Sequence, residues 1–327
     1  MNILVVGGAG YIGSHMVKWL ARRDCKVTTL DDLSTGFAAA VRYGELVTGS
    51  IADPIVLDQL FASQQFDAVM HFASFIQVGE SVKDPAKYYR NNFANTQNLL
   101  DAMVRHGVRR FIFSSTAAVF GEPLYTPIDE RHVLNPINPY GRSKLMVEQM
   151  LEDYDHAYGL KSFALRYFNA AGADPEGELG ERHEPETHLI PLVLQAASGR
   201  RGAITVFGAD YDTPDGTCIR DYIHIQDLCA AHWLGLQQLM QGAPSARYNL
   251  GNGNGFSVRE VIEAAERITN RSIPVIYGER RPGDPARLVA DATLARKLLE
   301  WQPRYADQET IIRHAWDWET KASKGNA

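Results

Sequence analysis

A tyrosine and a lysine spaced by one helical turn are the residues of this sequence best suited to acid–base chemistry. Tyr140 and Lys144 are four positions apart, which places both on one face of a helix. Asn138 and Pro139 suit the cap and the first position of that helix. Lowering the pKa of a tyrosine from about 10 to ~7 requires roughly 4 kcal/mol, and one nearby cation shifts a pKa by roughly 1–3 units. Lys144, helped by the helix N-terminus, therefore makes Tyr140 a candidate base; the alternative is a chance pair on the surface.

A glycine-rich turn near the amino terminus is suited to holding phosphates. Ile3–Val6 is a short apolar run typical of a buried strand, and Ser14–Leu20 has the composition of a helix. Between them, residues 7–13 contain a G-x-G-x-x-G pattern that starts at Gly8, with Gly7 as an additional glycine. Glycine allows the tight turn and a close approach of a pyrophosphate, and the helix N-terminus offers N–H groups to it. Because the pattern lies between a strand and a helix, it predicts dinucleotide binding rather than an ordinary turn.

An acidic residue follows the second expected strand. Lys26–Leu30 leads into Asp31, eighteen positions after Gly13, close to where a carboxylate meets the adenosine ribose of a dinucleotide. The same carboxylate would repel a 2′-phosphate, so Asp31 favours NAD over NADP. The alternative interpretation is a solvated loop acid.

Alternating strands and helices must position these residues. Further strands are expected at 45–48, 67–72 and 109–114, and a long helical stretch at 85–106. The third of these strands ends at Ser115 and Thr116, and ligands bind at that end of strands in open α/β sheets. The alternation from residue 3 to 166 predicts an α/β fold with a doubly wound, mainly parallel, Rossmann-like sheet.

The composition excludes several classes of protein. The chain has 327 residues, so one large domain and a second, smaller α/β domain are expected. A formal charge of −6 argues against a nucleic-acid surface, and no run is long and apolar enough to span a membrane. The three cysteines lack C-x-x-C spacing, which indicates buried thiols in a reducing compartment. A cytoplasmic protein is expected.

The alternation becomes irregular after Asn169. The remaining expectations are a loop at 173–187, a helix at 189–197, a strand at 205–208, a return to the large domain at 222–225, a last helix at 311–318 with core tryptophans, and a loose tail at 321–327.

These motifs resemble those of the extended short-chain dehydrogenase/reductase family. Its members carry the glycine turn, a Ser or Thr at the end of a strand, and Tyr-x-x-x-Lys. Within that family the sequence is similar to the epimerases of UDP-hexoses. The matching segments are His71–Ala73, Val78–Ser81, Asn91–Asn92, Phe113–Ser115, Tyr140–Glu148, Leu165–Asn169, Arg220–His224 and Tyr248–Gly251.

The resemblance implies a mechanism for galactose metabolism. Tyr140 removes the proton from the sugar 4-hydroxyl while the C4 hydride passes to NAD, and Thr116 hydrogen-bonds the same oxygen. Lys144 holds the nicotinamide ribose and favours the phenolate. The 4-keto sugar turns within the site and hydride returns to its other face, so UDP-glucose and UDP-galactose interconvert.

The resemblance also implies the binding residues. Those expected to contact NAD are Gly7, Gly10, Tyr11, Ile12, Gly13, Asp31, Asp32, Leu33, Ser34, Thr35, Gly36, Ser50, Ile51, Phe72, Ala73, Ser74, Asn91, Thr116, Tyr140, Lys144 and Phe168. Those expected to contact the UDP-sugar are Thr116, Tyr140, Asn169, His188, Leu189, Thr205, Val206, Phe207, Arg220, Arg281, Asp284 and Leu288. No metal is expected, because His183 and His188 have no carboxylate or thiol partners at metal-ligand spacing in the sequence.

The implied organisation is a homodimer of two-domain chains. Residues 1–169, rejoined by about 217–250, form the NAD-binding domain, and residues 170–216 and 251–327 form the smaller one. The dimer contact is expected at the helices around 90–106 and 143–157.

Several alternatives stay open. The substrate could be UDP-N-acetylglucosamine or a UDP-pentose. A sugar-nucleotide dehydratase is disfavoured, because Ala117 and Ala118 stand where the dehydratases of the family carry an Asp-Glu pair. A net dehydrogenase and a non-catalytic NAD-binding protein are the remaining possibilities.

Overall fold

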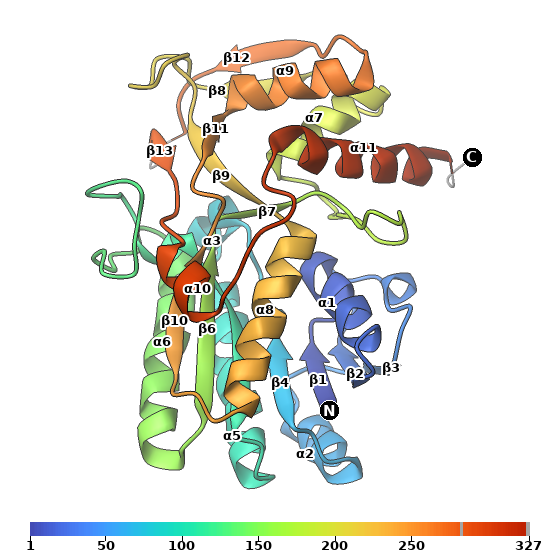
Figure 1. The fold of residues 1–327 in the computed structure, drawn as a ribbon, viewed down its shortest axis with the longest axis vertical. Coiled ribbons are helices and arrows are strands. Elements are labelled where there is room, and N and C mark those ends of the chain that lie inside the picture. The colour runs from blue at the N-terminus through green and yellow to red at the C-terminus, as the bar shows by residue number, and fades with distance from the viewer. Residues whose placement is uncertain (282–283, 325–327) are drawn as a thin grey trace.

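A seven-stranded sheet forms the larger part of the computed structural model, which describes residues 1–281 and 284–324 (Figure 1). The strand order is β10-β6-β5-β4-β1-β2-β3, and all neighbouring pairs are parallel. The strands are β1 Asn2–Val6, β2 Lys26–Asp31, β3 Glu45–Thr48, β4 Ala68–His71, β5 Arg110–Thr116, β6 Lys161–Tyr167 and β10 Ala246–Leu250. The order reverses between β1 and β4, and such a switch point opens a ligand-binding crevice at the carboxyl ends of the strands.

Helices cover both faces of this sheet, because side chains of each central strand alternate between two cores. Ile3 and Val5 of β1 belong to one core, whereas Leu4 and Val6 belong to the other. Helices α1 (Tyr11–Ala21) and α8 (Ile225–Met240) line the first core. The second core is lined by α2 (Pro54–Ser63), α5 (Asn95–Arg105) and α6 (Pro139–Tyr158). The predicted doubly wound sheet is confirmed.

The connection before α5 is helical but irregular. It consists of α3 (Val78–Lys83), α4 (Pro85–Tyr88) and a π-helical turn (Tyr89–Ala94) that runs directly into α5. The predicted single helical stretch at 85–106 therefore contains a wider turn in its middle. Single-turn elements also occur at Ala38–Ala40 and Ala117–Val119.

A smaller group of elements lies above the carboxyl edge of the large sheet in the view of Figure 1. Its four-stranded sheet contains β7 (Asn169–Ala171), β9 (Ile219–His224), β11 (Gly255–Ser257) and β13 (Arg287–Leu288). Strands β8 (Ile204–Phe207) and β12 (Val275–Gly278) pair separately. Helices α7 (Leu189–Ser198), α9 (Val258–Thr269) and α11 (Gln308–Lys324) share a third apolar core, and α10 (Thr293–Leu298) packs near β10.

Several expected boundaries differ from the structure. The first helix begins at Tyr11 rather than Ser14. Residues 222–224 belong to β9 of the smaller sheet, so α8 and β10 make the return to the large sheet.

The last helix is longer than predicted. It continues to Lys324, so the expected loose tail is wrong over residues 321–324, while 325–327 lie outside the described residues. Its tryptophans, Trp316 and Trp318, are partly exposed, and Trp301 is the fully buried one.

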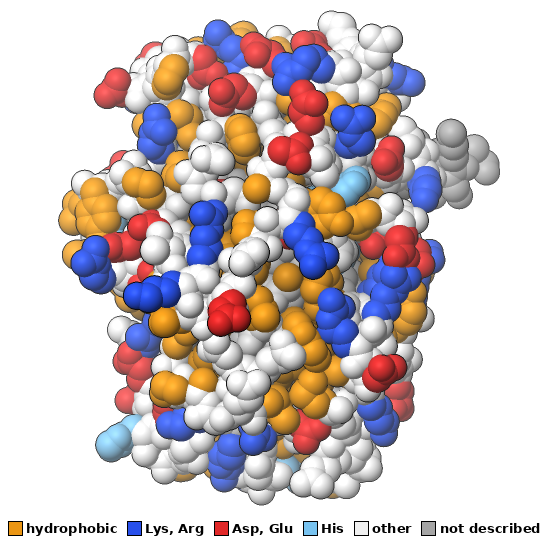
Figure 2. Space-filling view, in the orientation of Figure 1, with side chains coloured by type: hydrophobic (Ala, Val, Ile, Leu, Met, Phe, Trp, Pro, Cys, Tyr) orange, Lys and Arg blue, Asp and Glu red, His pale blue; other side chains and the backbone are white. Residues whose placement is uncertain are grey.

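The surface carries both signs of charge. Figure 2 shows Lys and Arg side chains interspersed with Asp and Glu over the face that it draws. Positive charge for a phosphorylated ligand must therefore be local. Among the described helices, none is long and apolar enough to cross a bilayer.

Candidate active site

The glycine turn lies at the switch point between β1 and β4. Gly7 has a φ of +82°, and a Cβ there would come within 2.4 Å of the Ala73 nitrogen. A Cβ on Gly13 would come within 2.1 Å of the Gly7 carbonyl oxygen, whereas one on Gly10 would meet nothing closer than 3.5 Å. Gly10 precedes α1 and no side chain caps that helix. Gly7 is thus an essential turn position rather than an additional glycine, and the open side of Gly10 is where a phosphate can approach.

Asp31 holds the glycine turn in shape. Its carboxylate accepts hydrogen bonds from the backbone N–H groups of Ala9 and Leu33, both at 2.9 Å. The residue is 8% exposed, and burial raises the pKa of its carboxyl group against the effect of these two bonds. Each carboxylate oxygen keeps a second acceptor position. Asp31 can therefore serve the turn and a ribose at once.

The other residues expected near the adenosine follow β2 and β3. Asp32 accepts a hydrogen bond from the Ser34 backbone N–H at 2.9 Å, and the Ser50 hydroxyl lies 3.5 Å from the Asp32 carboxylate. The loop packs on the glycine turn through a bond from the Phe37 N–H to the Ala9 carbonyl oxygen at 3.0 Å. Leu33, Thr35 and Gly36 lie in this loop, and Ile51 is buried below it.

Lys144 is buried at the carboxyl end of β5. Its ammonium group donates to the Ser74 hydroxyl at 2.7 Å and to the Ser114 carbonyl oxygen at 2.8 Å. Burial lowers the pKa of Lys144 to about 7, against the opposing effect of Glu148. Ser74 was expected at the cofactor, and it lies beside Lys144.

Thr116 and Tyr140 meet at the same edge. The Thr116 hydroxyl oxygen accepts a bond from the Ala118 N–H at 3.1 Å, and its hydrogen bond with Tyr140 lowers the pKa of the phenol. Burial has the larger effect and raises the pKa of Tyr140 overall. The expected lowering of this pKa by Lys144, helped by the helix N-terminus, is not seen, since Lys144 is not among the groups that shift the pKa of Tyr140.

Asn92 is a buried asparagine that was not among the residues expected at NAD, where only its neighbour Asn91 was named. Asn92 is 1% exposed and bonds to both the backbone N–H and the carbonyl oxygen of Phe75, each at 2.9 Å, and to the Ser143 hydroxyl at 3.2 Å. It fixes the loop after β4 against α6, whereas the predicted Asn91 is partly exposed and donates to Asn92. Helical spacing could have found it, because Tyr88, Asn92 and Thr96 are four apart and all buried.

The remaining residues expected at NAD pack around the crevice. The Tyr11 hydroxyl donates to the Gly172 carbonyl oxygen at 2.7 Å and so links α1 to the loop after β7. Ile12 and Phe72 are partly buried against the first core, and Phe168 packs on the cluster below Thr116.

Two arginines expected to contact the UDP-sugar lie on the smaller group of elements. Arg220 forms an ion pair with Asp284, another of the expected substrate residues. The Arg281 guanidinium lies 3.9 Å from the centre of the Phe207 ring. Thr205 is partly exposed beside them. Val206 is 2% exposed in the third core, so only its backbone can face a ligand.

Leu288 and Asn169 complete the expected sugar end. Leu288 belongs to a cluster with Ala117, Leu145 and Phe168, the first two being chain neighbours of Thr116 and Lys144. Asn169 donates from its side-chain amide to the Asp221 carbonyl oxygen at 2.9 Å.

His188 and Leu189 mark the start of α7. His188 is the cap residue of that helix and its Nδ1 contacts the Glu181 carboxylate. The statement that His183 and His188 have no carboxylate partners is wrong, because Glu181 and Glu186 lie against both.

The chain resembles proteins of one family throughout its length. Residues 3–251 match the model of the NAD dependent epimerase/dehydratase family. The UDP-glucose 4-epimerase of Halalkalibacterium halodurans is 49% identical over 325 residues, which are 99% of this chain and 97% of the relative. A crystal structure of UDP-glucose 4-epimerase from Brucella ovis in complex with NAD is 52% identical, with a TM-score of 0.94 over 96% of this chain and 97% of that one. The enzyme from Bifidobacterium longum, in complex with NAD+ and UDP, is 37% identical, with a TM-score of 0.94 over 99% of this chain and 100% of that one. The chain therefore belongs to the NAD dependent epimerase/dehydratase family.

Proposed function

We propose that this protein is an NAD-dependent epimerase that inverts C4 of a UDP-hexose, interconverting UDP-glucose and UDP-galactose. The observation that carries the proposal is the meeting of Thr116, Tyr140 and Lys144 at the carboxyl end of β5, beside the glycine turn. A phenol with a hydroxyl donor and a buried ammonium nearby is suited to moving one proton on and off a sugar hydroxyl.

The residues present fit NAD. Gly10 leaves room for a pyrophosphate at the start of α1, and Asp31 keeps acceptor positions for the ribose hydroxyls. Lys144 and Ser74 would hold the nicotinamide ribose. Because Asp31 would repel a 2′-phosphate, NAD is favoured over NADP.

Tyr140 takes the proton of the sugar 4-hydroxyl as C4 is oxidised. NAD, when bound, supplies the acceptor and later the donor of the C4 hydride. Thr116 donates a hydrogen bond that favours the phenolate, and the positive charge of Lys144 acts in the same direction. Tyr140 returns the proton once the 4-keto sugar has presented its other face, so the net redox change is zero.

The UDP part is held by the smaller group of elements in this proposal. Arg220 and Arg281 supply guanidinium groups, which suit a diphosphate. Asn169, His188, Leu189, Thr205, Val206, Phe207 and Asp284 complete the contacts, with Leu288 beside the sugar. The NAD-binding domain in this proposal is 1–168 rejoined by 225–250, and the UDP-sugar domain is 169–224 with 251–327, because β7 and β9 belong to the smaller sheet.

Two further inferences concern the cellular location and the oligomeric state of the protein. Cys25, Cys218 and Cys229 are all free and buried, which supports a cytoplasmic location. A homodimer through the helices around 90–106 and 143–157 is expected, and sedimentation analysis of the purified protein measures it.

Incubation of the purified protein with UDP-galactose, without added NAD, tests the proposal. UDP-glucose should appear by chromatography, and the Tyr140→Phe variant provides the control. Accumulation of a dehydrated 4-keto sugar would instead indicate a dehydratase, and formation of NADH in step with substrate loss would indicate a net dehydrogenase.

A further inference from the structure

A cluster of two glutamates and two histidines lies in the loop between β7 and α7. Glu181, His183, Glu186 and His188, here called the Glu/His cluster, each bring one possible ligand atom within 4.8 Å of all the others. The side chains of Glu181 and Glu186 are 6% exposed, and that of His183 is 22% exposed. Mixed imidazole and carboxylate groups at such distances suit a divalent transition metal.

The spacing around His183 fits a tetrahedral ion. Its Nδ1 lies 3.4 Å from an oxygen of Glu181 and 3.4 Å from an oxygen of Glu186. This Nδ1 is buried and has no hydrogen-bond partner among the described residues. Zinc bonds of about 2.0–2.2 Å place neighbouring tetrahedral ligands roughly 3.3–3.6 Å apart. The two distances therefore match a shared metal better than a direct hydrogen bond.

The other two members are held in place by further contacts. The second carboxylate oxygen atom of Glu186 accepts the backbone N–H groups of Thr187 at 2.7 Å and His188 at 2.9 Å. The Nδ1 of His188 contacts the Glu181 oxygen that also faces His183. The Trp318 indole of α11 donates to the Glu181 carbonyl oxygen at 3.1 Å. The backbone contacts of Glu186 and the Trp318 contact of Glu181 orient these two ligands from outside, whereas the direct contact between His188 and Glu181 is one that a bound ion would replace.

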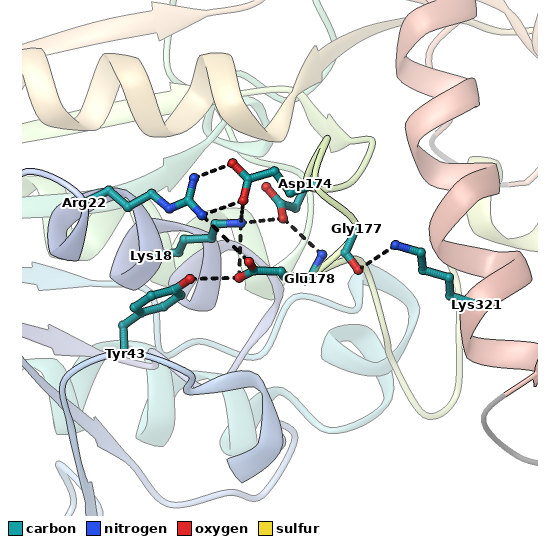
Figure 3. Close-up of polar contacts among 8 residues, drawn as sticks. Lys18, Arg22, Tyr43, Asp174, Gly177, Glu178 and Lys321 are labelled. Carbon is teal, nitrogen blue, oxygen red and sulfur yellow. Dashed lines mark hydrogen bonds and ion pairs between the residues drawn. The ribbon is translucent and has the colours of Figure 1, made fainter.

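The first half of the same loop is anchored to α1, as Figure 3 shows. The Lys18 ammonium lies 2.6 Å from Asp174, 3.1 Å from Glu176 and 3.2 Å from Glu178. Lys18 and Arg22 of α1 together offset most of the charge of these three acids, and the ion pairs anchor the loop to α1. The loop is preorganised where it enters the Glu/His cluster.

We propose that the Glu/His cluster binds one structural Zn²⁺ ion. Two carboxylates balance its charge while both imidazoles coordinate as neutral donors, so that the site, in which the His188 side chain is 42% exposed, carries no net charge. The His183 ring packs edge-on against Tyr11, with centroids 6.4 Å apart. The ion would therefore tie the loop to the first turn of α1 and to the start of α7. The competing arrangement is an ion-pair network in which both histidines are protonated.

Cobalt substitution distinguishes these arrangements without measuring activity. The tag-free holoenzyme is treated with a chelator and titrated with Co²⁺, whose tetrahedral complexes absorb strongly in the visible range. Wild type should develop these bands with an endpoint of about one ion per chain, and Zn²⁺ should abolish them. The matched control is Glu176→Gln, which removes an acid of the same loop outside the cluster and should behave like wild type.

Two variants remove one ligand each. His183→Gln and Glu186→Gln should bind Co²⁺ at least ~tenfold more weakly and lose the tetrahedral bands. Circular dichroism confirms that each is folded, and two variants are used so that one unfolded protein does not decide the test. Wild-type protein without tetrahedral bands, or bands that persist unchanged in the folded variants, would overturn the proposal in favour of the ion-pair network.

Discussion

The hydroxyl of Thr116 should set the pH at which the enzyme becomes active. Thr116→Val keeps the shape of the side chain but removes the hydrogen bond that lowers the pKa of Tyr140, leaving the burial that raises it. A hydrogen bond to a charged group contributes roughly 1.5–3 kcal/mol. One pKa unit corresponds to about 1.4 kcal/mol, so the pKa of Tyr140 should rise by roughly 1–2 units in the variant.

The assay is the pH profile of kcat/KM, which reports the free enzyme. Because the phenolate is the active form, kcat/KM rises with pH until the pKa of Tyr140 is passed. In Thr116→Val this rising limb should move to higher pH by roughly 1–2 units, with a rate about 10–100-fold lower on the limb. The difference should shrink as the pH increases further.

Thr116→Ser is the matched control, because it retains the hydroxyl donor and should keep the limb near its wild-type position. The valine variant also leaves the Ala118 N–H without its present acceptor, so thermal unfolding is recorded for both variants. An unmoved limb in the valine variant, or an equal shift in both, would refute the role of Thr116.

Three further outcomes are expected. Tyr140→Phe should retain bound NAD but lose about 10²–10⁴ in rate, and near-normal turnover would exclude Tyr140 as the base. Denatured protein should release NAD or NADH because of Asp31, and mainly NADP in the supernatant would contradict this role. Leu288 should disfavour an N-acetyl group on C2 by roughly 1–3 kcal/mol. The kcat/KM for UDP-N-acetylgalactosamine should thus be about 10–100-fold below that for UDP-galactose, and Leu288→Ser should raise only the former. Equal values for the two substrates in wild type would show that Leu288 does not limit the space beside C2 of the sugar.

Elements specified by nearby residues could be predicted from the sequence. Asn138 caps α6 as expected, with its side-chain oxygen accepting the Gly141 N–H at 2.9 Å, and Pro139 is the first helical residue. The parallel sheet also follows from local apolar runs separated by helices. Such patterns involve residues that are close in the chain, so they can be recognised from a single sequence without knowledge of the fold.

Contacts between distant segments could not be predicted in the same way. Lys144 bonds to Ser74, after β4, and to the Ser114 carbonyl oxygen of β5, two partners that its spacing from Tyr140 does not indicate. Burial, which dominates the pKa of Tyr140, depends on the whole packed structure.

The Glu/His cluster was missed for a different reason. Its four members, Glu181, His183, Glu186 and His188, are close in sequence but lie in an irregular loop. A loop has no helix or strand repeat from which the side chains that share one face can be predicted. The same loop is held to α1 by the ion pair between Lys18 and Asp174, which are separated by 156 positions.

The fate of the hydrogen on C4 tests the proposed reaction most directly. UDP-glucose carrying deuterium at C4 is incubated with the enzyme in ordinary water, and the UDP-galactose formed is analysed by NMR and mass spectrometry. Removal and return of the same hydride within one site predicts that the product keeps deuterium at C4. Product with solvent hydrogen at C4 would contradict hydride transfer to a resident NAD and, with it, the roles of Tyr140, Thr116 and Lys144.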